Sequence, residues 1–194
     1  MRIIRGKRLF NLLAIVAIMG LPVVSSYAQQ IRVDGTVVGI GGRFSGVTRP
    51  FRLTVNKLTS PGEVSELNQA LSSGGQDGLL RALSRMNAGR ITVGNGVGLR
   101  ANAVIADRWG NGGTKLTVFY ERNINFYELR AGSRSQDYKV GYAEIFLDSR
   151  GRGQGTFIPA ARVRLRDGNT WEVEDFGVYP ARLMGLRSTG QLLR

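Results

Sequence analysis

The feature that most constrains the fold of this chain is a two-residue alternation of apolar and polar side chains, which begins near residue 31. The clearest stretch is 161–166, with the sequence ARVRLR. A period of two is the period of a β-strand with one buried face and one solvent face. Short turns rich in glycine, asparagine and aspartate separate these stretches, and strands joined by such turns pair antiparallel.

The alternation and the turns together predict a mainly β protein of the α+β class. The predicted strands lie at residues 31–40, 47–58, 90–93, 98–107, 114–122, 124–130, 138–148, 155–166, 170–175 and 181–186. About eight to ten antiparallel strands of this length curl into a strongly bent sheet or close into a barrel. The sequence leaves open which of the two forms.

A helical hairpin is predicted at about 61–86, between the second and third strands. Ser60 and Glu63 form a capping-box pattern, with Pro61 at the first helical position, where its missing N–H is not needed. Leucines follow at helical spacing, and the sequence SSGG at 72–75 divides the segment in two. We expect the leucine stripe to pack against the sheet.

The first 28 residues read as a cleaved signal peptide. A basic head precedes an apolar run at 12–24, and small residues stand at the cleavage site, which we place between Ala28 and Gln29. The run of about 13 residues is shorter than the roughly 20 of a membrane-spanning helix. We therefore expect an exported protein, periplasmic or extracellular, with one domain at 29–194 and no transmembrane segment after cleavage.

The chain has no histidine and no cysteine, which excludes several classes of chemistry. Neither a Ser-His-Asp triad nor a Cys-His pair can be built, and histidine and thiolate metal sites are excluded as well. A loop at 148–155 resembles a calcium loop only in part, because Arg150 and Arg152 stand where oxygen ligands would be needed. We predict no catalytic residue, no metal and no cofactor.

Glu144 is the carboxylate with the most unusual predicted surroundings. Alternation places it on the same strand face as Tyr138, Val140, Tyr142 and Phe146. Burial among such side chains raises the pKa of a carboxyl group, as general acids require. The alternative is a half-exposed face on which Glu144 pairs with an arginine.

Arg162, Arg164 and Arg166 are the predicted anion-binding residues. They lie on one side of one strand, about 7 Å apart. After cleavage the chain keeps 23 basic and 14 acidic residues, a net charge of +9 that favours anionic neighbours. The alternative is a solvated face that protects a strand edge.

Four segments together resemble a family of small exported bacterial proteins of unknown function. They are Gly42-Arg43-Phe44, the strand-to-helix step at 54–66, the loop DSRGRGQG at 148–155, and the closing sequence EDFGVYPARL at 174–183. The resemblance covers about residues 42–187. It implies a signal peptide, a helical insert and a β-rich body, and it brings no activity, ligand or catalytic residue.

These observations favour an exported, non-catalytic binding protein that captures an apolar, amphipathic or anionic envelope ligand inside its curved sheet. The alternative is a structural or assembly factor that contacts envelope proteins or polymers through strand edges or arginines. A carboxylate-dependent hydrolase built on Glu144 is the least favoured. The expected partners are anionic lipid, polysaccharide or another envelope protein. Nucleic acid is disfavoured, because the aromatic residues do not interleave with the arginines.

Overall fold

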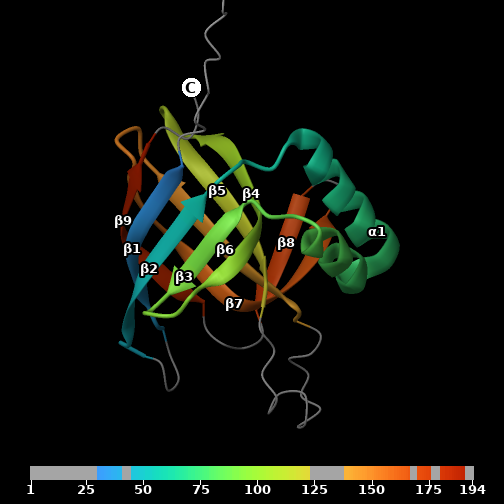
Figure 1. The fold of residues 1–194 in the computed structure, drawn as a ribbon, viewed down its shortest axis with the longest axis horizontal. Helices are drawn as coiled ribbons and strands as arrows, with labels where there is room; N and C mark the ends of the chain where they lie inside the picture. The colour runs from blue at the N-terminus through green and yellow to red at the C-terminus, as the bar shows by residue number, and fades with distance from the viewer. Residues whose placement is uncertain (1–29, 41–44, 123–137, 167–169, 176–179, 191–194) are drawn as a thin grey trace, which may run out of the picture.

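The computed structural model describes residues 30–40, 45–122, 138–166, 170–175 and 180–190 (Figure 1). In this part of the chain the elements are β1 (Ile31–Val38), β2 (Thr48–Val55), α1 (Pro61–Ser84), β3 (Gly89–Val93), β4 (Leu99–Trp109), β5 (Gly113–Glu121), β6 (Val140–Leu147), β7 (Arg152–Arg166), β8 (Thr170–Asp175) and β9 (Ala181–Thr189). The predicted fold class is confirmed. The predicted strand at 124–130, the cleavage site at Ala28 and Gln29, and the Gly42-Arg43-Phe44 motif lie outside the described residues.

Eight of these strands close into an antiparallel barrel. The hydrogen-bonded order runs β6-β5-β4-β3-β2-β1-β9-β7, and a further pairing of β6 with β7 closes the ring. Of the two forms that the sequence left open, the structure has the closed barrel. β8 is an additional strand outside the ring (Figure 1).

β7 is the longest strand and belongs to two parts of the sheet. One of its edges pairs with β6 along residues 153–161. Its other edge pairs first with β9, along 152–157, and then with β8, along 161–166. The second half of β7 therefore leaves the barrel as a two-stranded ribbon with β8.

Apolar side chains from all eight barrel strands fill the interior. This inner core includes Val33, Leu53, Ile91, Val104, Leu116, Val118, Ile145, Leu183 and Leu186, all almost fully buried. Across it, the ring of Phe157 contacts Phe51, with centroids 6.4 Å apart, and stacks on Tyr120, with centroids 5.8 Å apart. These strands therefore meet over a packed interior of side chains.

α1 packs on the outside of the barrel and on the β7–β8 ribbon (Figure 1). Its leucines join an outer core with Phe119, Tyr142 and Trp171, as the stripe predicted. The helix bends at Gly75, whose φ of 56° and ψ of −146° are accessible mainly to glycine. This bend is the break predicted at 72–75. Among the described residues, no helix is both long enough and apolar enough to cross a membrane.

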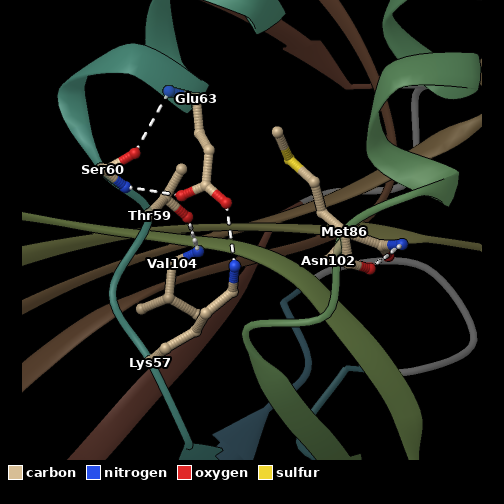
Figure 2. Close-up of polar contacts among 7 residues, drawn as sticks. All are labelled: Lys57, Thr59, Ser60, Glu63, Met86, Asn102 and Val104. Atoms are coloured by element: carbon tan, nitrogen blue, oxygen red, sulfur yellow. Dashed lines mark hydrogen bonds and ion pairs between the residues drawn. The ribbon is translucent and has the colours of Figure 1, made fainter.

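The first turn of α1 carries the predicted capping box (Figure 2). The Glu63 amide donates to Ser60 Oγ over 3.3 Å, and Glu63 Oε2 accepts from the Ser60 amide over 2.8 Å. Just before the cap, Thr59 Oγ1 accepts from the Val104 amide over 2.9 Å. The start of the helix is thereby fixed to β4, which positions the outer core.

Candidate functional site

The three arginines predicted to bind anions lie on the β7–β8 ribbon, opposite two glutamates. The strand register sets Arg162 across from Glu174 and Arg164 across from Glu172. Arg164 forms an ion pair with Glu174, with Nη2 and Oε2 3.3 Å apart, and Arg166 forms one with Glu172. Two of the three charges are therefore balanced by carboxylates on the neighbouring strand.

Arg162 is the member of this stripe that has no carboxylate partner in the described part of the chain. It lines a small pocket of about 220 Å³ with Gly74, Gln76, Asp77 and Lys139. Lys139 is held there by Asp77, with Nζ and Oδ1 2.6 Å apart. The pocket thus contains an ion pair and one further cation, which is a weak basis for an anion site.

Glu144 lies on the outer face of β6, between Tyr142 and Phe146, and its side chain is 26 % exposed. Lys115 Nζ is 2.6 Å from Glu144 Oε1, and the Tyr142 hydroxyl donates to the same oxygen over 3.2 Å. Burial and then the nearby Glu144 carboxylate raise the pKa of the Tyr142 hydroxyl, so that it keeps its proton and donates. The partner of Glu144 is thus a lysine, whereas the alternative from the sequence named an arginine.

A larger basic surface lies on the outer face of strands β1, β2, β3, β4, β7 and β9. We call it the arginine face, and it consists of Arg32, Arg52, Arg90, Arg100, Arg152, Arg182 and Arg187, all of them exposed. Directly opposite residues of paired strands share a face. The register joins these arginines in rows with Thr54, Thr92, Thr156 and Asp34.

The row structure shows that the arginine face points outward. Arg52 alternates on β2 with Phe51 and Leu53, which belong to the inner core. One row runs Arg100, Arg90, Thr54, Arg32 across four strands. A neighbouring row runs Thr92, Arg52, Asp34, Arg187, Arg152 across five strands.

Two pairs of arginines lie directly opposite each other within these rows. Arg90 of β3 pairs in register with Arg100 of β4, and Arg152 of β7 pairs with Arg187 of β9. Like charges at directly opposite positions destabilise a sheet, because their Cβ atoms are only about 5 Å apart. Part of this repulsion is relieved, because Arg90 donates to the Val97 carbonyl, Arg100 donates to the Ser84 carbonyl, and Arg152 lies 3.6 Å from Asp148. Arg187 has neither kind of partner among the described residues.

Few carboxylates balance these charges. Asp34 Oδ2 is 2.7 Å from Arg32 Nε, and Asp34 Oδ1 is 2.9 Å from Arg52 Nε. Burial raises the pKa of Asp34, but hydrogen bonds from Arg52 and Arg32 outweigh it, so the pKa lies below its ordinary value. Asp148 is 3.6 Å from Arg152. The other four arginines of the face have no carboxylate partner among the described residues.

Sequence reasoning missed the arginine face because its members come from strands far apart in the chain. Each strand contributes one or two arginines, and only the closed-barrel register brings them together. By contrast, the ion pairs of Arg164 and Arg166 could be predicted from the local sequence. Glu172 and Glu174 alternate just after a short turn, which is the pattern of a hairpin with opposite charges on facing strands.

Comparisons with known proteins add no further constraint on this site. No family model, no curated protein and no solved structure matches the chain. The resemblance to a family of small exported proteins therefore stays a prediction, and the functional argument depends on the geometry of the arginine face.

Proposed function

We propose that the protein is an exported, non-catalytic binding protein, periplasmic or extracellular, that holds an anionic envelope ligand on its arginine face. The ligand is an extended anion, either an anionic lipid surface or an anionic polysaccharide. The observation that carries this proposal is the gathering of seven exposed arginines on one outer face, with Arg90 opposite Arg100 and Arg152 opposite Arg187 in the strand register. An anion bound near arginines of neighbouring strands lowers their mutual repulsion and accepts charge-assisted hydrogen bonds from them.

The spacing of the face suits a chain or an array of anions. Neighbouring strands are about 4.8 Å apart, and residues on one face of a strand repeat about every 7 Å. Single phosphates or carboxylates fit between the guanidinium groups of adjacent strands, and several of them can be bound at once. Threonine hydroxyls in the same rows supply hydrogen-bond donors between the cations.

The proposal places the ligand outside the barrel. Capture inside the curved sheet was the hypothesis from the sequence, but the inner core side chains already occupy the space between the strands. The Phe51, Phe157 and Tyr120 rings in particular cross it from three strands. The outer face needs no rearrangement of the core to receive a ligand.

The test compares two double variants of equal charge change. Arg90→Gln with Arg187→Gln removes two cations from the arginine face, and Arg164→Gln with Arg166→Gln removes two cations already paired with Glu174 and Glu172. Binding to inorganic polyphosphate, polygalacturonate and vesicles containing phosphatidylglycerol is measured at several salt concentrations. We expect the first variant to weaken binding about tenfold and the second to leave it nearly unchanged.

Salt supplies the second criterion. Binding that depends on several arginines falls steeply as salt rises, because bound counterions are released on association. Equal weakening of binding in both double variants, or an affinity that does not change with salt concentration, would contradict the proposal. Neutral dextran and vesicles of phosphatidylcholine serve as uncharged controls.

The free edge of β8 favours the second candidate function, a structural or assembly factor. β8 pairs with β7 on one side, and no strand within the described residues pairs with its other side. A partner strand could add there through main-chain hydrogen bonds. Hydrogen exchange at 170–175 measures this directly: slower exchange in the presence of envelope proteins supports the assembly role, and unchanged exchange removes it.

A further inference from the structure

An open groove lies on the outer surface, between the β4–β5 and β6–β7 turns. Its volume is about 710 Å³, and Trp109, Phe146 and Gln154 are among its lining residues. Trp109 is 52 % exposed, an unusual position for a side chain of this size. We call this site the aromatic groove.

The aromatic side chains of the groove hold one another in place. The rings of Trp109 and Phe146 have centroids 4.6 Å apart and an interplanar angle of 53°. Lys115 Nζ lies 5.8 Å from the centroid of the Phe146 ring, and its ion pair with Glu144 fixes it there. The indole is therefore a preorganised apolar surface that remains accessible to solvent.

The polar side chains around the groove are suited to hydroxyl groups. Asn111 and Gln154 line it with neutral amides, which donate and accept hydrogen bonds. The Asp148 carboxylate is already engaged, because its Oδ1 accepts from the amides of Arg150 and Arg152, each over 2.8 Å. The same carboxylate lines the groove, and its Oδ2 lies 3.6 Å from Arg152 Nε, so an ion pair stands beside the two amides.

The aromatic groove and the arginine face are continuous, because Arg152 belongs to both. It lines the groove and lies opposite Arg187 in the register of β7 and β9. We propose that the aromatic groove binds a sugar ring of an acidic polysaccharide, whose charged groups continue onto the arginine face. This inference rests on the proposed function and chooses polysaccharide over lipid as the ligand.

The chemistry of the groove favours a sugar over an acyl chain. A pyranose has one face of C–H groups, which packs on the electron-rich face of an indole, and a rim of hydroxyls for the amides. An acyl chain gains from an enclosed apolar site, whereas this groove is open and carries polar side chains. The lining residues thus combine aromatic and amide side chains with the ion pair of Arg152 and Asp148.

The test uses Trp109→Ala, with Val97→Ala as a matched loss of an exposed apolar side chain outside the groove. Hexagalacturonate, which has both rings and charges, is compared with inorganic polyphosphate, which has charges alone. We expect Trp109→Ala to weaken hexagalacturonate about tenfold, to leave polyphosphate unchanged, and Val97→Ala to affect neither.

A second measurement uses the fluorescence of Trp109. The chain has two tryptophans, so Trp171→Phe leaves Trp109 as the single reporter. We expect hexagalacturonate to change its emission in a saturable way, and polyphosphate to leave it unchanged. Both measurements use the protein without residues 1–28. Circular dichroism verifies that each variant is folded.

Two sets of outcomes separate this inference from the proposed function. Equal loss of both ligands in Trp109→Ala, or no loss of either, overturns the sugar assignment while polyphosphate binding still supports the arginine face. A greater Trp109-dependent loss for hexauridylate than for hexagalacturonate overturns it in favour of a nucleobase. If neither hexagalacturonate nor polyphosphate binds the unaltered protein, the proposed function itself fails.

Discussion

Tyr120 of β5 lies with its ring against Gly141, its directly opposite partner on β6. A Cβ atom built at Gly141 would lie 2.0 Å from Cζ of the tyrosine ring. The ring cannot easily move away, since it stacks on Phe157, with an interplanar angle of 10°. Gly141 is thus a position without room for a side chain, because the aromatic ring of the neighbouring strand occupies that part of the inner core.

Gly141→Ala should therefore destabilise the protein. The added methyl group overlaps a fully packed ring, and overpacking of this kind lowers the free energy of unfolding by about 1–3 kcal/mol. Urea denaturation measures the loss. Gly62→Ala is the control, because a Cβ there has no contact closer than 4.0 Å and alanine favours a helix. Equal stability of the two variants would contradict the packing argument.

Asn102 connects the end of α1 to the barrel, and its loss should be among the more damaging polar changes. Its Nδ2 donates to the Leu83 carbonyl, and its Oδ1 accepts from the Glu121 amide, each over 2.8 Å; Figure 2 shows its weaker contact with Met86. Asn102→Ala takes away the acceptor of the Glu121 amide, whereas the Leu83 carbonyl still accepts from the Met86 amide. We therefore expect a loss of about 1–3 kcal/mol in urea denaturation.

The control for Asn102 is Asn56→Ala. Asn56 is exposed and accepts one hydrogen bond, from Gln30 over 2.9 Å. A change at an exposed polar site of this kind alters stability by less than about 0.5 kcal/mol. Similar losses of unfolding free energy in the two asparagine variants would show that the burial of Asn102 does not determine its contribution to stability.

Glu63 should make part of the stability depend on pH. A hydrogen bond from Lys57, and then one from the Ser60 amide, lower the pKa of Glu63 from 4.5 to about 2. Since the pKa is lowered on folding, the stabilisation is complete above about pH 4.5 and is lost as the pH falls towards 2. The difference in unfolding free energy between the natural protein and Glu63→Gln should shrink over that interval.

Glu66→Gln is the matched control, three residues further along the same helix. Glu66 is exposed and has no ion pair among the described residues. Its removal should leave the pH profile of stability almost unchanged between pH 2 and 5. A Glu63→Gln variant whose deficit stays constant over this range would exclude the capping-box carboxylate as the cause.

Local sequence patterns predicted the elements well because each depends on near neighbours. The capping box at Ser60 and the glycine break before residue 76 both appear in the structure. Alternation also placed Glu144 on one face with Tyr142 and Phe146, and β6 has that face. It could not tell that this face is the outer one, since both surfaces of these strands carry apolar residues: α1 covers one and the barrel interior the other.

Long-range pairing was beyond the local patterns. The pairing of β1 with β9 joins Arg32 to Thr189, which lie 157 residues apart in the chain. The division of β7 between β9 and β8 likewise depends on the whole ring. Because the candidate binding surface is assembled by these pairings, its arginines could be recognised as a group only from the structure.

The final prediction is that removing one arginine from the face stabilises the protein while it weakens binding. Arg187→Gln removes a like charge from the position opposite Arg152, and Asp34, opposite Arg187 on the other side, remains paired with Arg32 and Arg52. At low salt the unfolding free energy should therefore rise by about 0.2–1 kcal/mol. This gain should disappear at high salt, where the repulsion is screened.

Arg166→Gln, which breaks the ion pair with Glu172, should leave stability unchanged or slightly lower it. A residue that serves only the fold cannot raise stability when lost and lower affinity for polyphosphate at the same time, whereas a binding residue held at some loss of stability does both. A fall in stability of Arg187→Gln at low salt would contradict this account of the arginine face.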